Sequence, residues 1–260
     1  MSNRIVRVAA VSIALVIGGT VATTSFAGNA QPEAQSPPPA ATGGVAIVNA
    51  VPKMEISVAI DGEEVVGSLR LGAVPDPYPL APGSHEVTFS NGSDDFTATV
   101  DVAAGESSDV VVHLPAEVGG TPVVSVYPTP SEPIDPGKAR VILAHTATVA
   151  PADVVVDGQT VFTNIANGEF AEADVAAGGH EVSLLPAGVT GTPILGPLDV
   201  TLEEGTITSV YAYGNPADGS MDVIVRITGG TSSGAEPPSE IDTGSAGLVG
   251  RVHVWTFSGR

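Results

Sequence analysis

The chain has 260 residues and no cysteine, which excludes disulfide bonds, cysteine-ligated metal sites and thiolate catalysis. It carries 29 Asp and Glu against 9 Lys and Arg, a formal net charge of −20, so a phosphate backbone would repel it and we expect no nucleic-acid partner. Only 15% of the residues are charged and 43% are hydrophobic, a composition that favours a folded protein over a disordered acidic chain.

The first 27 residues have the pattern of a signal peptide. Arg4 and Arg7 precede an apolar run from Val8 to Ala22, and Ser25-Phe26-Ala27 supplies the small residues that signal peptidase favours. The apolar run is shorter than the ~20 residues of a membrane-spanning helix. We therefore expect cleavage before Gly28, secretion or an extracellular, envelope-associated location, and no membrane span afterwards; an uncleaved anchor is the alternative.

Three polar segments divide the rest of the chain. Residues 28–43 form a Pro-rich spacer, 128–138 a Pro-rich linker, and 229–260 a tail rich in Gly, Ser and Pro. The composition predicts that the spacer and the tail are disordered. Between them lie two bodies, 44–127 and 139–228, and we expect each body to fold alone, joined by a linker with few contacts.

The two bodies align with each other. Residues 45–69 (VAIVNAVPKMEISVAIDGEEVVGSL) match residues 141–165 (VILAHTATVAPADVVVDGQTVFTNI) without a gap. The alignment pairs Asp61-Gly62 with Asp157-Gly158, and further on His85-Glu86-Val87 pairs with His180-Glu181-Val182. Self-similarity of this kind indicates a tandem duplication.

Each body consists of short runs rich in Val and Ile, separated by Gly, Pro or Asp-Gly. Such runs are typical of small antiparallel strands, and an Asp-Gly pair between two of them predicts a tight hairpin. About seven strands in a body of this size fit an immunoglobulin-like sandwich. The sequence therefore predicts an all-β protein with two tandem immunoglobulin-like antiparallel β-sandwich domains.

The second body carries motifs of a known family, namely Ala139-Arg140-Val141, His145, Pro151-Ala152-Asp153-Val154, Val156-Asp157-Gly158 and the segment 186–193 (PAGVTGTP). In this combination it resembles the bacterial DUF4397 family. The first body departs from the pattern, with Asn49 in place of His145, and also resembles a PEGA-type module over 58–67 and 82–87. The resemblance implies exported β-sandwich modules of unassigned biochemical function and transfers no catalytic residue.

Histidine is scarce, with five residues in the chain. His85 and His180 open equivalent strands, where a ring is expected to cap the sandwich edge or hydrogen-bond the turn backbone. His145 lies within a few residues of Asp153, so a histidine–carboxylate pair and a hydrolase built on it form one alternative. The G-x-S-x-G match in the chain, residues 230–234 (GTSSG), falls in the tail rich in Gly, Ser and Pro and is not interpreted as a nucleophile elbow that would complete a triad.

Two further patterns bear on ligands. Residues 218–222 (DGSMD) are similar to the start of a calcium loop but lack the loop glycine and closing Glu, which favours a solvated hairpin turn. Asp218 and Asp222, with Asp94 and Asp95, are the carboxylates that a calcium-dependent alternative would use. The tripeptide Asn91-Gly92-Ser93 fits a glycosylation acceptor and is interpreted as a turn.

Sugar-binding sandwiches stack aromatic side chains on sugar rings. Tyr211 and Tyr213 alternate along one run, so both face the core or both form an exposed platform, and we favour the core. The segment 240–244 (EIDTG) is similar to a sortase anchoring signal but lacks its proline.

These patterns predict an exported, non-enzymatic protein that acts as a cell-surface or secreted binding or spacer module. Its expected partner is a surface protein or a polysaccharide, and we expect no catalytic, cofactor-binding or metal-ligating residues. The alternatives are a cell-wall glycan or calcium-dependent binding module, and a hydrolase that uses His145 and Asp153.

Overall fold

The computed structural model describes residues 41–230, all of which fall in one compact unit. This range contains strands, turns and loops and no helix, so the all-β prediction is confirmed. The predicted signal peptide, most of the spacer, and the tail beyond residue 230 lie outside the described residues. Within the described part, no helix is long and apolar enough to cross a membrane.

Sixteen strands form two sandwiches of eight strands each. The first contains β1 (Gly43–Asn49), β2 (Ile56–Ile60), β3 (Glu63–Leu69), β4 (Tyr78–Leu80), β5 (Gly83–Ser90), β6 (Asp95–Val102), β7 (Ser107–His113) and β8 (Val123–Thr129). The second contains β9 (Lys138–His145), β10 (Ala152–Val156), β11 (Gln159–Ile165), β12 (Phe170–Ala176), β13 (Gly178–Pro186), β14 (Leu195–Leu202), β15 (Thr206–Tyr213) and β16 (Asp222–Gly229).

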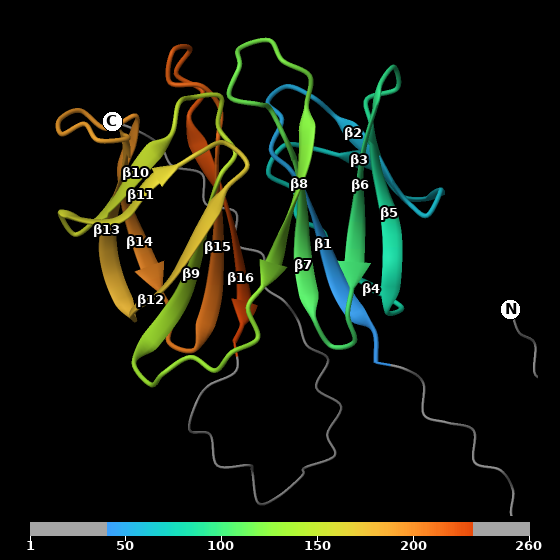
Figure 1. The fold of residues 1–260 in the computed structure, drawn as a ribbon, viewed down its shortest axis with the longest axis horizontal. Coiled ribbons are helices and arrows are strands. Elements are labelled where there is room, and N and C mark those ends of the chain that lie inside the picture. The colour runs from blue at the N-terminus through green and yellow to red at the C-terminus, as the bar shows by residue number, and fades with distance from the viewer. Residues whose placement is uncertain (1–40, 231–260) are drawn as a thin grey trace, which may run out of the picture. The chain divides into compact units, whose positions relative to one another are not determined.

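Both sandwiches have the same strand order. The first pairs a β4-β1-β7-β8 sheet with a β3-β2-β5-β6 sheet, and the second repeats this as β12-β9-β15-β16 with β11-β10-β13-β14. Figure 1 shows each sandwich as two layers of strands. The predicted sandwich architecture is confirmed, and it is mainly antiparallel; β1 with β7 and β9 with β15 are the parallel pairs. The strand order differs from that of an immunoglobulin domain, because β1 and β2 lie in different sheets.

The predicted Asp-Gly hairpins are present. Asp61 and Gly62 have φ values of 51° and 81°, and Asp157 and Gly158 have 50° and 76°. Two consecutive residues with positive φ match the turn whose twist suits antiparallel strands. Each pair joins its strands through a two-residue loop, β2 to β3 and β10 to β11.

The sheets β4-β1-β7-β8 and β12-β9-β15-β16 are here called the inner sheets, and their central strands, β1 with β7 and β9 with β15, are buried on both faces. In β1, Ile47 packs in the core of its own sandwich, whereas its neighbour Val48 packs in a cluster with Ala144 and Tyr211 of the second sandwich. This shared cluster contains Val48, Ala50, Val74, Val111, Tyr127, Ala144, Tyr211 and Ile224. The two sandwiches are therefore joined through an apolar interface between their inner sheets.

The linker takes part in this packing, contrary to the expectation of few contacts. Strand β8 continues to Thr129, and Ile134 is fully buried against Ile142 and Ile207 of the second sandwich. The backbone oxygen of Glu132 also accepts a hydrogen bond of 3.0 Å from Nη1 of Arg140. A buried isoleucine holds the linker against the inner sheet because solvating it would cost free energy.

The chain enters and leaves each sandwich at the same end. Gly44 pairs with Ser107 and Ser107 with Thr129, so β1 begins where β8 ends. In the second sandwich β9 begins where β16 ends, by the equivalent pairings. We call this the proximal end; the loops 114–122, 146–151, 166–169, 187–194 and 214–221 lie at the opposite, distal end (Figure 1).

Candidate functional site

A buried ion pair lies between the two sandwiches. Asp109 on β7 is 2% exposed. One carboxylate oxygen accepts a hydrogen bond of 2.9 Å from Nη1 of Arg226 on β16, and the other accepts one from the Tyr211 hydroxyl on β15. Arg226 is itself 8% exposed. The carboxylate of one sandwich is therefore neutralised and hydrogen-bonded by two residues of the other.

Burial raises the pKa values of the two acidic groups in this cluster, Asp109 and Tyr211. Desolvation raises the pKa of the Asp109 carboxyl, and the charge of Arg226 and the Tyr211 hydrogen bond oppose that rise. Desolvation and the nearby Asp109 charge raise the pKa of the Tyr211 hydroxyl well above its ordinary value. A site enclosed in this way has no room for a substrate, so the cluster is a contact between the sandwiches.

The distal loops of the two sandwiches are also joined. The Asn167 side-chain nitrogen donates to the backbone oxygens of Leu114, 3.0 Å away, and Ala147, 2.8 Å away. The Tyr127 hydroxyl donates to the Gly168 oxygen at 3.3 Å, and its ring meets Phe170 edge-on. Loop 166–169 therefore braces the first sandwich and the start of loop 146–151 against each other at the distal end.

The pair of His145 and Asp153, considered as an alternative, does not form. His145 is 1% exposed, neither ring nitrogen has a hydrogen-bond partner of normal geometry, and desolvation lowers its pKa. The Asp153 carboxylate instead accepts hydrogen bonds from the backbone N–H groups of Asn164 and Gly188, at 2.7 and 2.8 Å. Because the Asp153 carboxylate binds these two backbone N–H groups, it does not point at His145.

His85 and His180 have the predicted structural role, and the geometry repeats. Nδ1 of His85 lies 2.7 Å from the Asp61 carboxylate and Nε2 lies 2.8 Å from the Ala81 oxygen. His180 makes the same contacts, at the same distances, with Asp157 and the Ala176 oxygen. Both partners accept hydrogen bonds, so the ring satisfies them only when both nitrogens carry protons, and these bonds raise the pKa of each histidine.

Of the other carboxylates considered for a calcium site, Asp94 and Asp218 lie in turns, and Asp95 and Asp222 are the first residues of β6 and β16. Asp218 accepts hydrogen bonds from Ser220 N at 3.0 Å and Ser220 Oγ at 2.5 Å, which lower its pKa. Asp222 accepts from the Val223 N–H at 2.8 Å, and the Asp94 N–H donates to Asn91 Oδ1. Residues 41–230 contain no group of three or more acidic or histidine side chains arranged to hold a metal ion.

The two tyrosines considered for sugar stacking are not an exposed platform. Tyr211 is fully buried between the sandwiches, and Tyr213 is half-buried against the same shared cluster. The preference for a buried position is confirmed for Tyr211, although the core it fills is the interface and not the interior of its own sandwich. Sequence reasoning placed both side chains on one face but had no means of knowing what covers that face.

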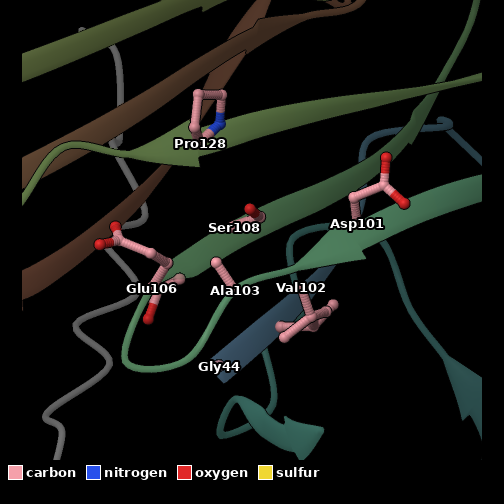
Figure 2. Close-up of a pocket in the computed structure, with 9 residues that line it drawn as sticks. Gly44, Asp101, Val102, Ala103, Glu106, Ser108 and Pro128 are labelled. Atoms are coloured by element: carbon pink, nitrogen blue, oxygen red, sulfur yellow. The ribbon is translucent and has the colours of Figure 1, made fainter. Parts of the chain in front are cut away.

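A small hollow lies at the proximal end of the first sandwich. It has a volume of about 220 Å³ and is lined by Gly44, Val45, Asp101, Val102, Ala103, Glu106, Ser107, Ser108 and Pro128. Figure 2 shows Asp101 and Glu106 at opposite sides of this group. Small-molecule sites usually measure about 300–1,000 Å³ and are predominantly apolar. The hollow is smaller than such sites, and its charged lining residues are the two acids Asp101 and Glu106.

Most of the large exposed apolar side chains of the described residues lie in or beside the distal loops. Val118 in loop 114–122 is 81% exposed and Val189 in loop 187–194 is 53% exposed. Val123 and Phe170, the first residues of β8 and β12, are also exposed at this end. The fifth large exposed apolar residue of the described range, Val161, lies within strand β11 and not at the distal end. We call Val118, Val123, Phe170 and Val189, with their loops, the distal surface.

The comparisons with known proteins give a family resemblance. Residues 43–152 match the family described as Domain of unknown function (DUF4397). The matched range covers the first sandwich, the linker and β9, and reaches the first residue of β10. We expected the stronger resemblance in the second body, whereas the match lies mainly on the first. No curated protein matches the chain. Over 43–152 the chain is therefore similar to the DUF4397 family.

Proposed function

We propose that residues 41–230 act as a rigid, non-enzymatic binding head of an exported protein, built from two tandem DUF4397-like sandwiches. The head contacts its partner through the distal surface. The proposal rests on one observation above all: the first and last strands both meet the flanking segments at the proximal end, and the exposed apolar residues lie at the other.

This arrangement favours binding over a spacer role. A spacer separates two points, so its chain needs to enter at one end and leave at the other. Here both flanking segments leave from the proximal end, and a tether in either segment would direct the distal surface outward. The buried Asp109–Arg226 pair and the braced distal loops keep that surface in one geometry, which lowers the entropy cost of binding.

The chemistry of the distal surface favours a surface protein over a polysaccharide as the partner. Protein interfaces have an apolar centre with a polar rim, and Val118 and Val189 are exposed beside Glu117 and polar loop residues. Stacking on sugar rings uses exposed aromatic side chains; Tyr211 is buried, and Phe170 is the one aromatic among the exposed apolar residues of the distal surface. The calcium-dependent and hydrolytic alternatives gain no comparable support from the carboxylates described above.

The test is binding of the full exported chain to cell-envelope proteins and to a glycan array. We compare the natural chain with the double variant V118E/V189E and with V161E, which alters an exposed apolar residue outside the distal surface. The proposal expects a protein partner that binds the natural chain and V161E but not the double variant. Binding that survives in the double variant, or a glycan ligand in place of a protein, would overturn it.

A further inference from the structure

The chain contains two Asn-Gly pairs in its described part, Asn91-Gly92 and Asn167-Gly168, and they lie in different surroundings. Asn91-Gly92 opens the exposed turn between β5 and β6. Asn167-Gly168 lies in the loop that braces the two sandwiches. The same dipeptide in two settings allows its chemistry to be compared within one molecule.

The Asn91 side chain is held by the backbone of its own turn. Its Oδ1 accepts hydrogen bonds from the N–H groups of Ser93, at 2.9 Å, and Asp94, at 2.8 Å. If the backbone nitrogen of Gly92 attacks Cγ of Asn91, negative charge develops on this same Oδ1. Two N–H donors at 2.7–3.1 Å from a developing oxyanion are the arrangement that stabilises such an intermediate.

The neighbouring groups leave this attack unobstructed. Gly92 has φ of 86° with nothing within 4 Å of where a Cβ would lie, so the backbone can approach the side chain closely. Its N–H makes one long contact, 3.3 Å to Ser90 Oγ. The Asn91 side-chain nitrogen, which would leave, has only a 3.5 Å contact to Asp94 and a 4.0 Å contact to Met54 sulfur.

Asn167 is held in the opposite way. Its side-chain nitrogen donates two normal hydrogen bonds, to the Leu114 and Ala147 oxygens. The N–H of Gly168, the would-be nucleophile, is engaged in a 2.7 Å hydrogen bond to the His145 oxygen. Attack here would break the contacts that join the sandwiches, so the fold protects this pair.

We propose that Asn91 is a site of spontaneous deamidation and that Asn167 is protected. The Gly92 nitrogen loses its proton to solvent base and bonds to Asn91 Cγ, and the Cγ–N bond breaks to release ammonia. The resulting succinimide adds one water, which gives aspartate or isoaspartate at position 91. The modification adds one negative charge to a turn that already contains Asp94 and Asp95.

The test is incubation of the full chain at neutral and at alkaline pH, followed by peptide mapping with mass spectrometry. Deamidation adds about one dalton, because an amide NH₂ is replaced by OH. In the folded chain we expect the modified fraction at Asn91 to exceed that at Asn167 by about tenfold or more, and to rise with pH. The variant N91S should lose the modification there and leave Asn167 unchanged.

The same chain unfolded in urea is the control, because both Asn-Gly pairs are then equally exposed. We expect the two positions to react at similar rates in urea, and Asn91 to react at least as fast in the folded chain. Equal modification of Asn91 and Asn167 in the folded chain would overturn the proposal. So would slower reaction of Asn91 in the folded chain than in urea.

Discussion

The two sandwiches share every strand pairing but differ where they face each other. Ala46 pairs with Asp109 and its counterpart Ile142 pairs with Ser209, so Asp109 and Ser209 hold equivalent positions. Two residues further along these strands, Val111 corresponds to Tyr211. Tyr127, which pairs with Asp109, corresponds to Arg226, which pairs with Ser209. The acid is on one sandwich and its two partners are on the other.

The His85–Asp61 and His180–Asp157 contacts, in contrast, are present in both sandwiches with the same geometry. A contact inside a sandwich can repeat in each copy because each copy needs it. A contact between sandwiches has two sides, so equivalent positions carry complementary residues instead of identical ones. The comparison shows which residues serve the fold of a single sandwich and which serve the pair.

The largest expected effect follows from breaking the contact between sandwiches. Asp109→Ala leaves the Arg226 guanidinium buried without its carboxylate, and removing one partner of a buried ion pair costs about 3–5 kcal/mol. Equilibrium denaturation in urea measures this as a drop in the free energy of unfolding. The matched control is Asp199→Ala, an exposed acid on β14, which should change stability by no more than about 0.5 kcal/mol. A similar small change for Asp109→Ala would show that the pair does not hold the sandwiches together.

A smaller effect is expected for Tyr211→Phe. The ring and its packing remain, and only the hydroxyl that donates to Asp109 is lost. Losing one donor to a buried carboxylate costs about 1–3 kcal/mol. In a cycle with Asp109→Ala the two losses should not add, because both remove the same hydrogen bond. Fully additive losses would place Tyr211 and Asp109 in separate interactions.

Salt should raise the stability of both the natural chain and the Asp109→Ala variant. With a net charge of −20, most carboxylates lack a basic partner, and their mutual repulsion opposes the compact state until ions screen it. The buried Asp109–Arg226 pair is screened little, so the difference between the two chains should persist. Thermal melts across a sodium chloride series measure this, and a melting temperature that falls with salt would contradict it.

The smallest effect concerns the contacts that both sandwiches keep. His85 and His180 have raised pKa values, so their contribution to stability is full below pH 6.5 and is lost as the pH rises through the folded-state pKa. Asp61 and Asp157 have lowered pKa values, so their contribution is present above pH 3.8 and is lost as the pH falls through the folded-state pKa.

Single variants isolate this pH dependence. His85→Gln and His180→Gln should each lower the melting temperature below pH 6.5 and have less effect in alkaline solution. The measured quantity is the difference in melting temperature between each variant and the natural chain. This difference is needed because the buried His113 and His145 have lowered pKa values, so their contribution makes stability rise with pH. The equal geometry predicts equal losses at the two positions, and clearly unequal losses would refute the equivalence.

Sequence reasoning predicted the parts of the fold that local chemistry determines. Asp61-Gly62 and Asp157-Gly158 identified two hairpins because few other residues accept positive φ there. The interface was missed, although one signal for it was present: the runs 45–51 (VAIVNAV) and 109–114 (DVVVHL) are apolar without alternation, as expected of strands buried on both faces. Asp109 stands in such a run, but its partner Arg226 is 117 positions away, and no local pattern connects them.

The proposed pairing of His145 with Asp153 failed for a related reason. Closeness along the chain suggested a contact, but Asp153 lies on β10 and turns to the N–H groups of Asn164 and Gly188. Turn formation, not proximity in sequence, determines the partners of this carboxylate. The distal surface was equally beyond sequence reasoning, since only the strand order places the loops of Val118 and Val189 at the same end.

The central claim is that the two sandwiches are one rigid unit, and differential scanning calorimetry of the full chain tests it most directly. The buried Asp109 cluster and the shared apolar core predict a single transition whose calorimetric and van't Hoff enthalpies agree. Asp109→Ala should shift that transition to lower temperature. Two separate transitions in the natural chain, one for each sandwich, would contradict the claim.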